Sequence, residues 1–230
     1  MTPPSRDLTL FDLDGTLISG DSDHSFGEFM VQVGWADGDA WRARNDEFYK
    51  TYLEARLDVH AYVDFATSVW RRRSAGEQAE ISARFMREVI APMITPRALE
   101  LVREHQRRGD LVAIVTATNE FVTRPIAEAF GVPELLAIEL ERDAAGAVTG
   151  AIRGVPTYQA GKVTRVEQWL AAHPAGPLSW SDFGRISVYS DSTNDLPLLE
   201  RATDPVATNP SAALAKVAAE RGWRLLRLFE

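Results

Sequence analysis

The sequence predicts an α/β protein, a doubly wound parallel sheet with an inserted α-helical segment, and three observations support this class. Residues 8–17 begin with a short apolar run that ends in two aspartates, which is typical of a buried strand with a charged tip. Residues 19–90 carry apolar and aromatic side chains at helical spacing, without a convincing strand. From residue 99 onward strands and helices alternate, which indicates right-handed crossovers in a parallel sheet.

Composition limits the possible functions. The chain has 230 residues, of which 45% are hydrophobic and 25% charged, as in ordinary globular proteins. Its net charge of −8 argues against nucleic acid or an anionic membrane as the main partner, and the absence of cysteine excludes disulfides and thiolate chemistry. No apolar run approaches the roughly 18 residues of a membrane helix, and the polar residues 1–6 are too short for a signal peptide. We therefore expect a soluble, cytoplasmic protein whose oligomeric state the sequence does not indicate.

The first expected strand ends in Asp12 and Asp14, with Gly15 directly after them. If the extended backbone continues, both carboxylates point to the same side, and glycine then permits a sharp turn. Two close carboxylates repel each other unless a cation lies between them or one holds a proton. An all-oxygen site suits a hard divalent cation such as Mg²⁺. Taken alone, the pattern is as typical of solvated acids in a turn.

The remaining elements follow in order. The aromatic stripes between residues 19 and 90 indicate about four helices with a shared apolar core. Pro96, with Thr95 as N-cap, opens a helix that Gly109 closes. Further strands are expected at 111–115, 135–140, 147–152, 186–189, 205–207 and 223–229, and further helices at 120–130, 161–172, 196–201 and 211–221. In such sheets ligands bind beyond the carboxyl ends of the strands. Four candidate residues follow the expected strand ends directly: Asp12, Asp14, Thr116 and Asp191.

Four motifs in this order resemble those of haloacid dehalogenase (HAD) superfamily phosphatases over essentially the whole chain. They are Asp12-Leu13-Asp14-Gly15-Thr16-Leu17, then Thr116 after Val115, then Lys162, then Asp191-Ser192-Thr193-Asn194-Asp195. The insert resembles the C1 cap of the phosphoserine-phosphatase-like branch, subfamily IB. The resemblance implies a Rossmann-like core domain at residues 1–18 and 91–230 and a helical cap domain at 19–90.

The resemblance also implies the chemistry. Asp12 would attack phosphorus and form an aspartyl-phosphate, while Asp14 would act as acid and base. Mg²⁺ would be held by Asp12, by the main-chain carbonyl of Asp14 and by Asp191. Thr116 and Lys162 would bind phosphoryl oxygens. Asp195 would lie behind the metal ligands. The candidate substrate-binding residues are Asp23 and His24, which closely follow the first motif, together with Ala117 and Asn194. His24 is equally typical of a structural hydrogen-bonding residue.

Taken alone, each later motif has a simpler structural interpretation. A threonine at a strand end usually caps a turn, and a lysine near a helix start is usually solvated. Lys162 would lie in the first turn of a helix, where a cation is unfavourable, and this favours a special role. Ser190 and Thr116 stand where many relatives have glycine and serine, which leaves the subfamily and substrate open.

The expected function is hydrolysis of a small phosphorylated metabolite, with phosphoserine, histidinol phosphate or a related phosphate as candidates. Two alternatives stay open: a mutase that transfers the phosphoryl group, and a non-catalytic protein that binds phosphate or metal.

Overall fold

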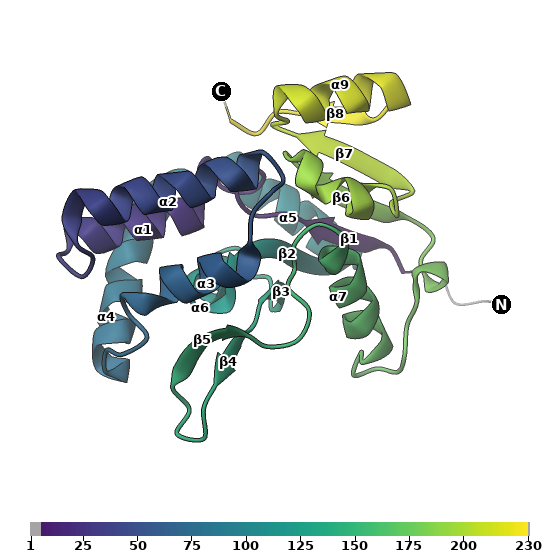
Figure 1. Cartoon of the computed structure of the whole chain (residues 1–230). Helices are drawn as coiled ribbons and strands as arrows, with labels where there is room; N and C mark the ends of the chain where they lie inside the picture. The colour runs from purple at the N-terminus through teal and green to yellow at the C-terminus, as the bar shows by residue number, and fades with distance from the viewer. Residues whose placement is uncertain (1–5, 230) are drawn as a thin grey trace.

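A six-stranded parallel sheet lies at the centre of the fold, with strand order β3-β2-β1-β6-β7-β8 (Figure 1). The computed structural model describes residues 6–229, so the expectation of no signal peptide lies almost wholly outside the described residues. The strands are β1 (Leu8–Phe11), β2 (Leu111–Asn119), β3 (Glu134–Ile138), β6 (Ile186–Ser190), β7 (Asp204–Thr208) and β8 (Arg224–Leu226). This arrangement confirms the predicted doubly wound α/β class.

Alternate residues of the central strands face two different apolar cores, as a sheet covered on both faces requires. Leu8 and Leu10 belong to one core, which Val166 of α7 and Leu214 of α9 complete. Phe11 belongs to the other, whose members come from β2 and β6 and from helices α5 and α6. The helices of the core are α5 (Pro96–Arg108), α6 (Glu120–Ala129), α7 (Ala160–Ala171), α8 (Leu196–Leu199) and α9 (Ala212–Arg221).

Local sequence signals set the ends of α5 as expected. The Thr95 side chain accepts a hydrogen bond from the Ala98 backbone N–H, and Gly109 ends the helix with a φ of 82°. A left-handed residue at this place favours glycine, because a Cβ would be strained there.

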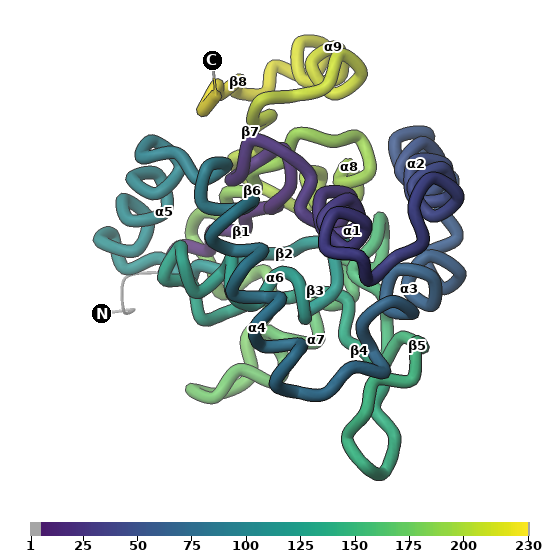
Figure 2. Tube along the Cα trace, turned by 90° about the vertical axis from the view of Figure 1, so that its left-hand side faces the viewer, coloured from purple at the N-terminus to yellow at the C-terminus, as the bar shows by residue number. Residues whose placement is uncertain are grey.

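Residues 22–85 form the helices of the insert, which gather beside the sheet in both views (Figures 1 and 2). They are α1 (Ser22–Gln32), α2 (Gly38–Leu53), α3 (Val59–Ser68) and α4 (Ala75–Phe85), as the aromatic periodicity predicts. Their apolar side chains, such as Phe26 and Phe85, share one buried cluster with the α5–α6 face of the sheet. The insert therefore has no core of its own, and its treatment as a separate cap domain at 19–90 stays a proposal.

A hairpin of β4 (Leu140–Arg142) and β5 (Val148–Ile152) leaves the edge of the sheet and packs against α3. No helix among residues 6–229 combines the length and the apolar composition that a membrane crossing needs.

Strand β2 differs from the sequence expectation, because it continues past Val115 to Asn119. Its pairing with β3 shifts register between Val115 and Asn119. The Thr157 hydroxyl donates to the carbonyl of Thr116 at 2.6 Å and satisfies this buried acceptor within the irregular stretch. Thr116 thus lies inside the end of the strand and not after it.

Candidate active site

Asp12 directly follows β1, and its carboxylate is buried, with 6% of the residue exposed. Its backbone N–H donates to the carbonyl of Tyr189 at 2.9 Å, which extends the pairing with β6 by one residue. Asp12 Oδ1 accepts a hydrogen bond from Lys162 Nζ at 2.8 Å, and Oδ2 accepts one from Thr16 Oγ1 at 3.1 Å. The carboxylate is therefore fixed at the carboxyl edge of the sheet.

Asp14 is held by two groups that no motif in the sequence indicates. Its Oδ1 accepts from the backbone N–H of Ser22, at the start of α1, at 2.6 Å. Its Oδ2 accepts from Thr118 Oγ1 at 2.9 Å. Burial, followed by the negative charge of Asp21, raises the pKa of Asp14 to about 7. This carboxyl is thus suited to give and take a proton near neutral pH.

Lys162 lies in the first turn of α7 and is 1% exposed. It donates to Asp12 at 2.8 Å and to Asp195 at 2.7 Å, so one buried ammonium joins two carboxylates. Burial lowers the pKa of Lys162, but the two carboxylates outweigh burial and keep the pKa above its ordinary value. The unfavourable helix position is offset by these two ion pairs.

Asp195 contacts the ammonium and also accepts from the Ser190 hydroxyl at 2.8 Å. Ser190 therefore supplies a donor to this carboxylate. Burial raises the pKa of Asp195 to about 6, although Lys162 opposes the shift. In the structure Asp195 positions Lys162, and its predicted place behind the metal ligands stays a prediction.

Asp191 approaches the first motif because position 15 is glycine. A Cβ on Gly15 would lie 2.5 Å from Asp191 Oδ2, and the backbone there has a φ of 70°. The Asp191 N–H donates to Thr16 Oγ1 at 3.1 Å, and the same hydroxyl contacts Asp12 Oδ2 at 3.1 Å. Burial, followed by the charges of Asp12 and Asp195, raises the pKa of Asp191 to about 9.

These groups fit a hard divalent cation. Asp12 and Asp191 approach each other through Thr16, and burial, followed by the charge of Asp12, raises the pKa of Asp191, so a cation held between the two carboxylates would favour their ionised forms. Carboxylate and carbonyl oxygens are the ligands that Mg²⁺ prefers. Within residues 6–229, Lys162 is the buried cationic side chain of this cluster. Its ammonium already forms ion pairs with Asp12 and Asp195.

A pocket lies between the sheet edge and the insert, and the predicted residues Asp12, Asp14, Thr116 and Ala117 line its floor. Thr116 is 1% exposed, and its hydroxyl accepts from the backbone N–H of Thr118 at 3.1 Å. This acceptor role leaves the hydroxyl hydrogen available to donate to a ligand.

The insert supplies the rest of the pocket wall, which is acidic and aromatic. The wall comprises Asp21, Asp23, His24, Asn45, Phe48, Tyr49, Tyr52, Leu57, Val59 and Tyr62, with Thr118 and Tyr158 from the core. Burial, followed by the charges of Asp21 and Asp14, raises the pKa of Asp23 well above its ordinary value, while a Tyr62 hydrogen bond opposes the shift. The helical spacing of the aromatic residues predicts packing between helices, and it does not indicate their place in this wall.

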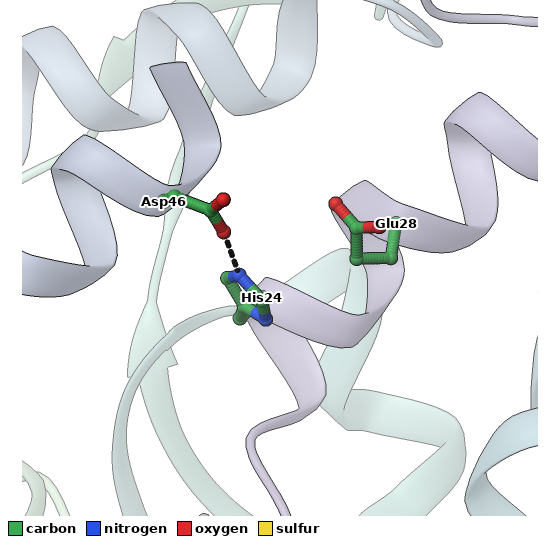
Figure 3. Close-up of side chains that lie close together, drawn as sticks. All are labelled: His24, Glu28 and Asp46. Atoms are coloured by element: carbon green, nitrogen blue, oxygen red, sulfur yellow. Dashed lines mark hydrogen bonds and ion pairs between the residues drawn. The ribbon is translucent and has the colours of Figure 1, made fainter. Parts of the chain in front are cut away.

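His24 lies at the edge of the pocket and is directed toward the acid Asp46 of α2 (Figure 3). Its Nε2 lies 2.8 Å from Asp46 Oδ1, and Glu28 is close by. Glu28 pairs with Arg42 at 3.1 Å, and Asp46 is mostly exposed. Arg42 compensates the charge of Glu28, and solvent hydrates Asp46. The cluster of His24, Glu28 and Asp46 therefore does not require a bound metal ion.

Asn194 is turned toward the insert. Its Nδ2 donates to the carbonyl of Tyr52 at 3.0 Å, and its Oδ1 accepts from Gln159 at 3.4 Å. The structure thus brings Asp12, Asp14, Thr116, Lys162, Asp191 and Asp195 together, and the roles expected for them stay predictions. The predicted substrate contacts of Asn194 and His24 remain predictions.

The chain is similar in sequence to two curated phosphatases. A histidinol-phosphatase of Neisseria meningitidis is 39% identical over 221 residues, covering 96% of this chain and 98% of that protein. The phosphoserine phosphatase SerB1 of Mycobacterium tuberculosis is 31% identical over 228 residues, covering 96% of this chain and 72% of its own.

Two solved structures resemble the fold. A Bordetella pertussis protein of unknown function has a TM-score of 0.90 at 44% identity, and the match covers 98% of this chain and 100% of that one. A substrate-bound phosphoserine phosphatase has a TM-score of 0.68 at 18% identity, covering 97% and 94%, which shows the fold alone. Residues 9–200 match the haloacid dehalogenase-like hydrolases, and the chain belongs to that family.

Proposed function

We propose that this hydrolase is a Mg²⁺-dependent phosphatase that cleaves a small phosphomonoester through an aspartyl-phosphate on Asp12. The observation that carries the proposal is the buried Asp12 carboxylate, fixed by Lys162 at 2.8 Å at the floor of a pocket that also holds Asp14. The names of the two phosphatase relatives support the same reaction class.

In the proposed first step, an Asp12 oxygen forms a bond to phosphorus while the bond to the ester oxygen breaks. Asp14 gives its proton to that leaving oxygen. In the second step, water attacks the acyl phosphate, its proton passes to Asp14, and inorganic phosphate and free Asp12 result. The pKa of about 7 for Asp14 suits both directions of this transfer.

Lys162 lowers the repulsion between the Asp12 carboxylate and the phosphate dianion, and Thr116 offers a hydroxyl to a phosphoryl oxygen. When bound between Asp12, Asp191 and the Asp14 carbonyl, Mg²⁺ would supply further charge neutralisation. The insert excludes water from the pocket when it covers a bound substrate.

The pocket wall favours a leaving group with an ammonium group and no carboxylate. Asp21 and Asp23 line it, whereas no lysine or arginine is among its lining residues within 6–229. A carboxylate would face this acidic wall without a partner, while an ammonium group and a flat ring would meet acids and tyrosines. We therefore place histidinol phosphate first among the candidate substrates and phosphoserine second, in line with the Neisseria relative.

The test is release of inorganic phosphate from both esters, with Mg²⁺ and with chelator. Asp12→Asn should abolish release, whereas Asp39→Asn, an exposed aspartate of α2, should act as the wild type does. Turnover that survives Asp12→Asn, or that ignores the chelator, would contradict the mechanism. A mutase would instead move the phosphate to a second hydroxyl with little release, and a non-catalytic protein would release none.

A further inference from the structure

The turn ahead of α7 contains a residue in an unfavourable backbone conformation. Gln159 has a φ of 50° and a ψ of −124°. The Gly161 N–H donates to the Tyr158 carbonyl at 2.9 Å and closes a four-residue turn around Gln159. These angles match the first central position of a type II′ turn, where glycine is strongly favoured. A non-glycine residue held there points to a demand on its side chain.

The Gln159 side chain forms hydrogen bonds that connect the core to the insert. Its Nε2 donates to the carbonyl of Ala55 at 3.1 Å, just beyond the end of α2, and lies 3.4 Å from Asn194 Oδ1. Asn194 in turn donates to the carbonyl of Tyr52, in the last turn of α2, at 3.0 Å. The Tyr52 carbonyl also accepts from the Ala55 N–H at 3.0 Å, so the two core amides add hydrogen bonds to the turn that ends α2.

The same two amides adjoin the groups proposed for catalysis. Gln159 is the N-cap residue of α7, whose first turn carries Lys162. Asn194 is the chain neighbour of Asp195, which pairs with Lys162 at 2.7 Å. On the insert side, Tyr52 lines the substrate pocket. The end of α2, the turn before α7 and the fourth motif are thus joined by one small group of hydrogen bonds.

We propose that Gln159 and Asn194 form a latch that holds the end of α2 closed over the pocket. The latch rests on the proposed function for its catalytic meaning, because it would couple closure of the insert to the placement of Lys162. Both are positioning residues, since neither amide is needed for the bond changes at phosphorus.

The test compares Gln159→Met with Gln159→Gly. Methionine keeps the chain length and the backbone strain but removes the donor, whereas glycine removes the donor and also relieves the strain. The matched control is Gln106→Met, which removes a comparable 2.8 Å amide bond to the Gly131 carbonyl on the other side of the sheet. We expect the glycine variant to unfold at a higher denaturant concentration than the methionine variant.

Hydrogen exchange gives a readout that does not need activity. Both Gln159 variants should speed amide exchange at Ala55 and Arg56, whose N–H groups bond to Tyr52 and Thr51, by about three- to tenfold, as the loss of one net hydrogen bond implies. Gln106→Met should leave this exchange as in the wild type. Unchanged exchange at these amides in either Gln159 variant would overturn the latch, even if the enzyme proves to have another activity.

Kinetics then test the coupling to catalysis. Both Gln159 variants should raise KM by a similar factor and lower kcat less, because the open state binds substrate less tightly. Faster exchange with wild-type kcat and KM in an active enzyme would overturn the coupling. A wild-type chain without phosphatase activity would refute the proposed function and leave the exchange result to decide the latch.

Discussion

Replacing Lys162 by methionine should destabilise the protein strongly, because this side chain is a buried cation between two carboxylates. Its Nζ lies 2.8 Å from Asp12 and 2.7 Å from Asp195, and the residue is 1% exposed. Methionine has nearly the same length and no charge, so packing is largely kept while both ion pairs are lost.

The expected loss of unfolding free energy is about 3–5 kcal/mol at pH 7.5, the range for breaking a buried pair by removing one partner. The pKa of Asp195 is about 6 with the Lys162 ammonium in place. Because this ammonium lowers the pKa, replacing Lys162 by methionine raises the pKa of Asp195 further. One carboxyl then takes up a proton, and each unit of that pKa shift corresponds to about 1.4 kcal/mol. The loss should therefore be smaller at pH 5.5 than at pH 7.5.

Urea unfolding of four proteins tests this reasoning. Lys216→Met, at an exposed site on α9, should stay within about 0.5 kcal/mol of the wild type. The double variant Lys162→Met/Asp195→Asn should recover at least about half of the loss, since it removes one unpaired charge. We expect no phosphate release from either of the two variants that lack Lys162. A single variant within about 1 kcal/mol of wild type, or a double variant less stable than the single, would refute the charge argument.

Three further outcomes follow from the same geometry. Gly15→Ala should lose about 1–3 kcal/mol in urea unfolding and most of its phosphatase activity, because a Cβ would lie 2.5 Å from Asp191 Oδ2; wild-type turnover would count against the close approach. Asp23→Asn should lower kcat/KM on histidinol phosphate about ten- to a hundredfold, and lower it less on an aryl phosphate, because the substrate ammonium would lose a carboxyl whose ionised form it stabilises against the burial that raises its pKa. Equal losses on both substrates would contradict amine recognition. In chelated protein the pKa values of Asp14 and Asp191 are about 7 and 9, above the ordinary 3.8, so these groups stabilise the fold at low pH and lose that contribution as pH rises through 7 and 9. Urea unfolding should then show less stability at pH 8.5 than at pH 5.5, with a smaller difference in Mg²⁺, and a rise with pH would oppose this reasoning.

The sequence was sufficient for the features that depend on local rules. Thr95 and Gly109 mark the ends of α5 because capping acts within a few residues. The apolar run before Asp12 predicts a buried strand, and the end of a parallel strand predicts the edge where ligands bind. These rules require no knowledge of distant contacts.

The sequence does not predict the contacts between segments that lie far apart along the chain. Thr118 and the Ser22 N–H hold Asp14, yet nothing in the sequence near either residue indicates an acid partner. Helical spacing correctly placed Tyr49 and Tyr52 on inward faces of α2, but it does not say whether that face meets packed side chains or a pocket. Asn194 bonds to the Tyr52 carbonyl, a contact that only the folded insert creates.

The balance of charge in the site bears on the alternative of a non-catalytic protein. Burial raises the pKa values of Asp14, Asp191 and Asp195, so keeping these groups ionised at neutral pH opposes folding. A scaffold that only had to be stable would gain by replacing them with neutral side chains. Their cost is understandable if the cluster binds a cation and moves a proton, which a hydrolase requires and a passive phosphate site does not. The mutase alternative shares every one of these groups, and only the fate of the phosphoryl group separates it from the hydrolase.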